Sequence, residues 1–443
     1  MPPTTISSLH GPSTPGIFNL LAYAFAPSRF ALRNAESFGR VYRVRGPGGA
    51  LLVTSHPEHV KRIFAADSDA FETYSQFTLG GVLGKQSVLV TAGPTHRRQR
   101  KLLSPPLTGA RLRAFGATMQ EIADRHVSAL RPGREFRALE LCTDFTLDVI
   151  VQTVFGVTDG AEGASLRDNL RVMVHEVPAL AVFMPRLQRS WFRPWARYVR
   201  ASERFDAWLR GKLAEPSAQA LVDEDRDVLS LLRQARADDG TPMEQAELRD
   251  QLVTLLLAGH ETTSIALASC LERIHRHPDV LAQVRAEIAA APSGPADVQH
   301  LPYLSAVIDE TLRIAPVLSD VTRRARSEFW LDEQLRLNPG EGVLVLIEAL
   351  HRDPELYAEP ARFRPERFLE RKFTRYEFLP FGGGVRRCLG AAFSDYETKI
   401  LLATLLRRVD LRLLRDRPDE RVRRNVTLGP KHGVPMRVVA LRS

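Results

Sequence analysis

A cysteine lies in an unusual setting near the carboxyl end of the chain, in the segment FLPFGGGVRRCLG (378–390). Cys388 follows three glycines, which free the backbone for close approach and unusual dihedral angles. A valine and two arginines separate the glycines from the cysteine, and burial of the arginines would require anionic partners. Backbone N–H groups, arginine charge and the start of the helix-like segment that follows would together stabilise a thiolate.

A thiolate in this setting could exchange disulfides, attack an electrophile or bind a metal. Redox exchange usually uses a C-x-x-C pair, which this segment lacks. Nucleophilic catalysis needs a base, and no histidine is close in the sequence, although the fold could supply one. Ligation of a haem iron needs one cysteine and cations for two propionates, so the local composition favours ligation. Cys142 and Cys270 lie in apolar helical patterns and are expected in the core.

Polar residues also interrupt a long apolar helical pattern in LLLAGHETTS (255–264). The ordinary explanation is a turn that reaches solvent, or a threonine bonded to the carbonyl four residues earlier. An acid followed by a threonine, here Glu261 and Thr262, is rarer in a buried helix. The small pair Ala258–Gly259 just before them would let a flat group approach the helix.

Two further pairs have helical spacing. Glu310 and Arg313, in ETLR, share a helix face and could form an ion pair, although most such pairs are exposed and contribute under about 1 kcal/mol. His96 and Arg100, in THRRQRK, are four residues apart and could bind one anion together. A basic, solvated face is the ordinary interpretation of that segment, and it suits the two arginines next to His96.

Together these segments resemble the cytochrome P-450 monooxygenases. FGGGVRRCLG matches the haem-binding loop of that family, F-x-x-G-x-R-x-C-x-G, at every fixed position, and the other segments follow in the family's order over nearly the whole chain. The resemblance implies that Cys388 is the axial thiolate ligand of haem b. The other positions that it places at the haem are Phe381, Gly384, Arg386, Gly390, Ala258 and Gly259.

The resemblance also assigns roles to the remaining pairs. Thr262 and Glu261 become the oxygen-activating pair, on a helix that crosses the distal haem face. Glu310, Arg313 and Arg367, the last from FRPERF, become a buried network that braces the haem loop. The haem propionates would be contacted by His96, Arg100 and Arg323, with Arg324 as the rival of Arg323.

The fold predicted from periodicity is mainly α with small β-sheets, in one large domain without a linker. Alternating patterns and turn residues predict β-rich parts at about 40–70 and 327–348, and i, i+3, i+4 patterns predict helices between 94 and 320. The resemblance implies a single fold over 1–443, with the haem between the long distal helix and the cysteine loop.

Composition limits the class of protein and its surroundings. The net charge of +9 is spread among acidic residues, without a block of like charges or a nucleic-acid signature, so we expect no nucleic-acid partner. No run of eighteen apolar residues predicts a membrane span, and three cysteines argue against a disulfide framework. We expect a cytoplasmic monomer, and the arginine-rich, lysine-poor composition suggests a bacterial source.

The resemblance implies insertion of one oxygen atom from O2 into an apolar substrate, by hydroxylation or epoxidation. An acidic ferredoxin and its reductase would supply electrons, docking near Arg97, Arg98, Lys101 and Arg387. The substrate would be lipid-like, a terpenoid, a steroid or a macrolide. Its expected contacts are Phe77, Leu79, Phe183, Met184, Leu257, Val317 and Leu318, for which core packing is the ordinary alternative. The rival functions are an H2O2-driven peroxygenase and a haem-binding protein without turnover.

Overall fold

The structure is a computed structural model, and it describes residues 4–46, 49–73, 79–158, 160–175, 185–215, 227–292 and 294–442. The chain forms two compact units, each made of three segments that are distant in the sequence. The first unit comprises Met1–Tyr74, Pro302–Cys388 and Pro418–His432, and the second comprises Ser75–Leu301, Leu389–Arg417 and Gly433–Ser443. The expectation of a single domain stays a prediction.

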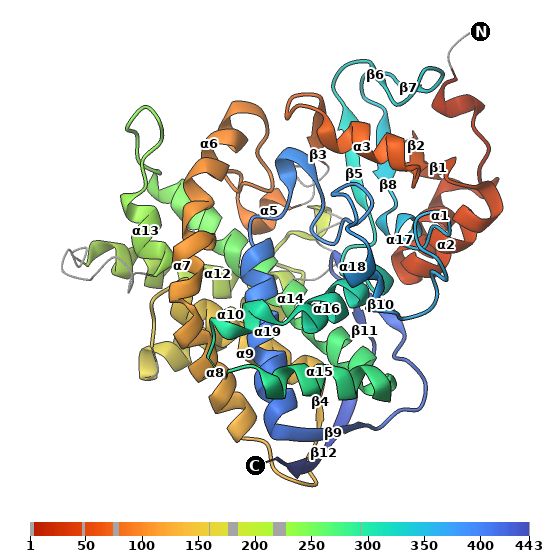
Figure 1. Ribbon diagram of the computed structural model, residues 1–443. Coiled ribbons are helices and arrows are strands. Elements are labelled where there is room, and N and C mark those ends of the chain that lie inside the picture. Colours follow the sequence, from red (N-terminus) through yellow and green to blue (C-terminus); the bar gives the residue numbers. More distant parts are fainter. Residues whose placement is uncertain are drawn as a thin grey trace. The chain divides into compact units, whose positions relative to one another are not determined.

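The first unit contains, in chain order with η for 3-10 helices, η1 (Ile6–Ser8), α1 (Gly16–Phe25), α2 (Pro27–Phe38), β1 (Val41–Gly46), β2 (Gly49–Thr54), α3 (Pro57–Ala65), β3 (Phe71–Thr73), α16 (Pro302–Ile314), β5 (Val321–Ala325), β6 (Phe329–Trp330), β7 (Arg336–Leu337), β8 (Gly342–Val345), α17 (Ile347–Leu350), α18 (Arg367–Glu370), η6 (Gly384–Arg386), β10 (Arg421–Arg424) and β11 (Thr427–Pro430) (Figure 1).

A five-stranded sheet with the order β1-β2-β8-β5-β3 is the frame of this unit. β2 and β8 run parallel, and the other neighbours are antiparallel. The apolar face of α3, with Val60, Ile63 and Phe64, packs in one buried cluster with Leu52 of β2 and Val343 of β8. The sheet therefore fixes the position of β5, which carries Arg323 and Arg324, the two alternative candidates for a propionate contact.

The second unit contains, in chain order, α5 (Gly80–Leu83), α6 (Gly93–Leu103), η2 (Pro105–Leu107), α7 (Gly109–Ala114), α8 (Gly116–Ser128), β4 (Glu135–Arg137), α9 (Ala138–Thr153), α10 (Ala161–His175), η3 (Pro185–Leu187), α12 (Arg193–Ala214), α13 (Val228–Gln234), α14 (Gln245–Arg276), α15 (Pro278–Ala290), η5 (Asp297–His300), α19 (Ala391–Arg408), β9 (Val409–Leu413) and β12 (Pro435–Leu441). β4, β12 and β9 form its sheet, with β12 in the middle.

The 32-residue helix α14 is the central element of this unit and lies against α9 and α19. It ends at Arg276 because Pro278 follows, and a proline disfavours helical geometry in the residue before it. In the described part of the chain it alone is long and apolar enough to cross a membrane, and 61% of its apolar window is buried within the protein. That burial is what a core helix requires.

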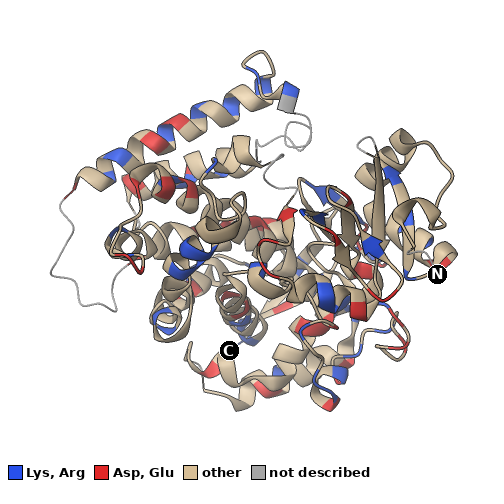
Figure 2. Ribbon diagram, turned by 90° about the horizontal axis from the view of Figure 1, so that it is seen from above, with Lys and Arg blue, Asp and Glu red and all other residues tan. Residues whose placement is uncertain are grey.

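The boundaries of the predicted β-rich parts need correction. The part at 40–70 contains strands only up to Thr54 and then helix α3, whose apolar residues recur with helical spacing. The second sheet-forming region begins earlier than 327, at Val321 of β5. The strands at the carboxyl end, β9 and β12, were not predicted, although VDLRL alternates apolar and polar residues. Basic and acidic residues are interspersed on the helices, as expected (Figure 2).

Candidate active site

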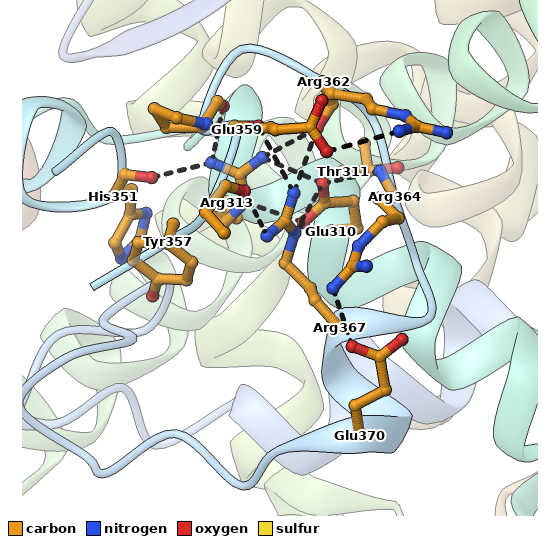
Figure 3. Close-up of polar contacts among 12 residues, drawn as sticks. Glu310, Thr311, Arg313, His351, Tyr357, Glu359, Arg362, Arg364, Arg367 and Glu370 are labelled. Carbon is orange, nitrogen blue, oxygen red and sulfur yellow. Dashed lines mark hydrogen bonds and ion pairs between the residues drawn. The ribbon is translucent and has the colours of Figure 1, made fainter. Parts of the chain in front are cut away.

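A carboxylate buried between two guanidinium groups lies in the first unit (Figure 3). Glu310 and Arg313 have side chains that are 0% exposed, and Arg367 is 4% exposed. Arg313 donates from Nε to Glu310 Oε2 at 2.7 Å and from Nη2 to Oε1 at 2.8 Å. Arg367 Nε donates to Oε1 at 3.1 Å, and the backbone N–H of Arg364 donates to the same oxygen at 2.8 Å. The structure thus brings together the three residues predicted as a network.

The remaining N–H groups of the two arginines bind backbone carbonyls of the segment before α18. Arg313 donates to the carbonyls of His351 at 2.7 Å and Pro360 at 2.9 Å, and Arg367 donates to that of Ala358 at 2.9 Å. Because carbonyls carry no charge, the single carboxylate supplies the negative charge for both cations. Helix α16 and the segment 351–367 are therefore held in one geometry.

Two residues that the sequence analysis did not identify connect this network to the cysteine loop. His351 Nε2 accepts a hydrogen bond from the backbone N–H of Leu379 at 2.9 Å, and Tyr357 Oη donates to the carbonyl of Glu377 at 3.0 Å. Burial, together with the charge of Arg313, lowers the pKa of His351 to about 3. The ring is therefore neutral, and because Nε2 accepts, its proton is on Nδ1. This hydrogen bond to the neutral ring holds the segment that leads into the loop.

The loop around Cys388 folds back on itself. The backbone N–H of Cys388 donates to the carbonyl of Phe381 at 2.9 Å, across the turn η6. Gly384 has φ of +63°, and a Cβ at this position would lie 1.8 Å from the carbonyl oxygen of Phe64. Only glycine fits there. The cysteine itself is exposed, whereas Cys142 and Cys270 are fully buried in the second unit, as predicted.

Two arginines lie beside this loop. Arg323 of β5 and Arg386 of the loop line a small pocket together with Gly383, Phe64 and Asp67. Burial, and to a lesser extent the charge of Arg386, lower the pKa of Arg323 to about 10. Among the described residues no carboxylate forms an ion pair with Arg323, whose own bond is to the carbonyl of Thr322 at 3.0 Å. A buried cation next to a second cation is a site for an anion.

The strand geometry of β5 distinguishes the two candidate arginines. Successive side chains in a strand point to opposite faces of the sheet. Arg324 is half exposed, donates to the carbonyl of Gly340 at 3.0 Å and lies 3.7 Å from Glu72. Its neighbour Arg323 points to the other face, toward Arg386. The geometry favours Arg323 for a propionate, and its role stays a prediction.

In the second unit, α14 has an accessible stripe in the middle of a mostly buried helix. Ala258 is exposed, and Leu255, Leu257 and Thr262 are partly exposed, while their neighbours at Leu256 and His260 are buried. Leu255, Ala258 and Thr262 follow the i, i+3, i+7 spacing of one helix face. Since Ala258 and Gly259 are small, this face can accept a flat group, as the sequence suggested.

Hydroxyl groups bind three carbonyls within this turn of α14. Thr262 Oγ1 donates to the carbonyl of Ala258 at 2.7 Å, the bond that was the ordinary alternative for this threonine. Ser264 Oγ donates to the carbonyl of Glu261 at 2.9 Å. Thr146 of α9 lies 2.9 Å from His260 Nδ1 and 3.3 Å from the His260 carbonyl. Thr146, which the sequence analysis missed, fastens this turn of α14 to α9.

Helix α6 presents the other predicted propionate residues. His96 is buried and Arg100 is partly buried, four residues apart on one face, as expected. Arg98 is not simply solvated. Its Nη1 contacts both carboxylate oxygens of Glu247 at 2.9 Å, and Lys101 lies 2.5 Å from Asp238. Two of the cations expected to attract a ferredoxin therefore already have acidic partners.

The predicted substrate contacts are only partly placed. Phe77, Phe183 and Met184 lie outside the described residues. In the second unit, Leu79 and Leu257 are partly exposed. In the first unit, Val317 is buried and Leu318 is 38% exposed. Their assignment to a substrate pocket stays a prediction.

The residues present fit a haem group. An iron needs one soft ligand, and Cys388 is an exposed cysteine in a loop whose glycine allows close approach. The propionates need cations, and Arg323 is a buried cation beside Arg386. The described residues hold no cluster of three or more His, Cys, Asp or Glu that would bind a metal instead.

Comparisons with known proteins agree on one family. The chain matches the family described as Cytochrome P-450 over residues 9–434. It is 34% identical to cytochrome P-450 135A1 of Mycobacterium tuberculosis, over 98% of this chain and 95% of the relative. It is 35% identical to cytochrome P-450 135B1 of Mycobacterium bovis, over 94% and 88%.

The fold has a counterpart among solved structures. The structure titled retinoic acid bound cyanobacterial CYP120A1 superimposes with a TM-score of 0.84 and 23% identity, over 99% of both chains. The predicted fold class is confirmed. The chain belongs to the cytochrome P-450 family, and it is an oxidoreductase of the monooxygenase type that binds haem iron through a cysteine thiolate.

We predict that Glu310→Ala destabilises the protein by roughly 3–5 kcal/mol, because two buried guanidinium groups lose the one carboxylate that pairs with them among the described residues. Denaturant unfolding of the purified variant measures the loss. Glu370→Ala is the control, since Glu370 is 56% exposed and pairs with the partly exposed Arg364; it should cost under about 1 kcal/mol. Equal losses in the two variants would contradict a charge-dependent role of Glu310.

Gly384→Ala should cost roughly 3 kcal/mol or more, because the new Cβ meets the Phe64 carbonyl in a left-handed backbone conformation. Gly382→Ala is a matched control with φ of +66° and open space around its Cβ, so it should cost only about 1–2 kcal/mol. Thermal unfolding and haem content after purification distinguish them. A Gly384→Ala protein as stable as the control would refute the close approach.

Acidification should destabilise the protein in part through His351. Its folded-state pKa of about 3 lies below the ordinary value, so the unfolded chain binds more protons between about pH 6.5 and 3, and stability falls as pH falls through that window. His351→Gln keeps an acceptor for Leu379 and should reduce the slope by up to ~1.4 kcal/mol per pH unit. Unfolding at several pH values tests this, with the exposed His10→Gln as control. An unchanged slope would contradict the neutral buried ring.

Proposed function

We propose that this cytochrome P-450 monooxygenase inserts one oxygen atom of O2 into an apolar organic substrate, with electrons from a separate ferredoxin and its reductase. The observation that carries the proposal is the exposed Cys388 in a glycine-shaped loop, near the buried guanidinium of Arg323, which forms no ion pair with a carboxylate among the described residues. The buried network around Glu310 supports that loop through His351 and Tyr357.

Haem b, when bound, supplies the activation of O2. Cys388 Sγ would hold its iron, and Arg323 and Arg386 would hold propionate oxygens by charge-assisted hydrogen bonds. His96 and Arg100, on one face of α6, would contribute further propionate contacts. The glycines of the loop let the backbone approach the group closely.

The middle of α14 would handle protons. The Thr262 hydroxyl donates to the carbonyl of Ala258, and its oxygen can still accept a hydrogen bond on the accessible stripe. It can accept a proton-bearing group there, or rotate to donate. Glu261, one residue earlier and partly exposed, can exchange protons with solvent. Thr146 and His260 hold this turn against α9, so that both groups keep their position.

Electron supply from a ferredoxin accords with the basic surface, but the residues need revision. Arg98 is held by Glu247, and Lys101 by Asp238, so neither contributes its full charge to a docking surface. Arg97 and Arg387 are exposed and remain our candidates. Charge reversal at Arg98 would also break its contact with the nearly buried Glu247, so Arg97→Glu and Arg387→Glu are the cleaner variants, and their effect should diminish with salt.

The substrate class follows from the apolar candidates. In the second unit Leu79 and Leu257 are apolar and partly exposed; in the first unit Leu318 is apolar and exposed, whereas Val317 is buried. A lipid-like, terpenoid, steroid or macrolide compound fits this chemistry. A titration of the ferric protein with one compound of each class identifies the chemotype, because a ligand that displaces iron-bound water shifts the absorption band to shorter wavelength.

We predict that Thr262→Val and Glu261→Gln each lower product formed per electron consumed by on the order of 10²-fold, because a positioned proton-transfer group contributes that much. Thr263→Val is the control, since the Thr263 hydroxyl is bonded to Ser394 at 3.1 Å and buried. The measurement is product against electron-donor consumption and released H2O2.

Full coupling in both variants would contradict the assigned roles. Turnover with H2O2 together with none in any ferredoxin system would show the peroxygenase instead. Substrate binding without turnover under either condition would show a haem-binding protein.

A further inference from the structure

Helix α1 turns polar residues toward the protein and apolar residues toward solvent, the reverse of an ordinary surface helix. Its polar residues Asn19 and Tyr23, four apart, face the rest of the first unit. Asn19 is 3% exposed, and its Nδ2 donates to the carbonyls of Thr14 and Arg45, each at 3.2 Å. Tyr23 Oη donates to Asp320 Oδ2 at 2.7 Å. These bonds fasten α1 beside β1 and α2 (Figure 1).

The large apolar residues of α1 face outward. Their exposed fractions are 53% for Ile17, 61% for Phe18, 43% for Leu20, 44% for Leu21 and 80% for Phe25. A surface helix normally buries such residues and exposes its polar ones. A contiguous exposed apolar face of this kind marks a site of interaction. We call these five residues the apolar face of α1.

The elements that contact α1 are strongly basic. Residues 4–46 contain five arginines and one glutamate. Arg40 forms ion pairs with Asp353 and Glu355, whereas Arg29, Arg33 and Arg45 are exposed. β10, which also contacts α1, carries Arg423 and Arg424, and the Arg423 guanidinium lies 4.5 Å from the centre of the Tyr23 ring. The apolar face is thus accompanied by positive charge.

We propose that the apolar face of α1, with these arginines, docks the protein on an anionic lipid bilayer. A helix with an outward apolar face and basic neighbours lies in the plane of the interface, where its side chains enter the acyl region and its cations meet lipid phosphates. At 10 residues α1 is too short to cross a bilayer. A second copy of the chain is the less suitable occupant, because a two-fold contact sets the same patch against itself and would bring arginines against arginines.

The test is sedimentation of the haem-loaded protein with vesicles of phosphatidylcholine alone, and with vesicles containing equal parts of phosphatidylglycerol. Binding is expected to the anionic vesicles and not to the neutral ones, and it should weaken with salt. Phe18→Ser combined with Phe25→Ser should weaken binding by at least roughly tenfold, and Arg29→Glu combined with Arg33→Glu by a similar factor. Val439→Ser, a 54% exposed apolar residue on β12, is the control and should bind normally.

Three results would overturn the proposal. The first is no binding of the unaltered protein to anionic vesicles, and the second is equal binding to neutral ones. The third is a dimer in sedimentation velocity that the Phe18/Phe25 variant abolishes, which would make a second copy the occupant. Because vesicle binding needs no turnover, failure here leaves the proposed monooxygenation untouched, and an inactive protein could still bind vesicles. Circular dichroism of each variant shows that it is folded.

Discussion

The segment that leads to the cysteine loop depends on one buried carboxylate, that of Glu310. Glu310 pairs with two guanidinium groups that are shielded from water, and among the described residues no other carboxylate forms an ion pair with Arg313 or Arg367. A buried ion pair adds little net stability compared with apolar packing, but removing one member leaves an uncompensated charge that is very costly. Its value here is geometric. Each guanidinium uses its remaining N–H groups to hold carbonyls of the segment 351–367, so a long irregular stretch takes one conformation.

Two uncharged side chains connect this segment to the cysteine loop. His351 and Tyr357 lie beside the network and form hydrogen bonds with the backbone of Leu379 and Glu377, just before the glycine loop. The loop then needs no regular structure of its own to present Cys388. The second unit presents the complementary chemistry on a stripe of α14, where hydroxyl groups satisfy carbonyls and small residues leave room.

Sequence reasoning found the residues whose type is unusual for their position. It missed residues whose role depends on hydrogen bonds to other elements of the fold. Cys388 could be identified because glycines and arginines beside a cysteine do not suit a core. Glu310 and Arg313 have an ordinary explanation as an exposed pair on one helix face, and only the family resemblance assigned them to a buried network. His351 and Thr146 also have an ordinary explanation, since each is a common residue in a common pattern, and only the fold shows what they touch. Strand alternation in β5 separated Arg323 from Arg324 once its bounds were known. The exposure of the apolar face of α1 could not be predicted, because periodicity shows which residues share a helix face but not which face the rest of the protein covers.

The central claim is that this fold exists to present the Cys388 thiolate to a haem iron. The most direct test is the absorption spectrum of the reduced, carbon monoxide-treated protein, recorded for the unaltered chain and for Cys388→Ala. The account predicts the red-shifted Soret band of thiolate ligation in the first and its loss in the second. The absence of that band in the unaltered protein, or its persistence in Cys388→Ala, would contradict the account.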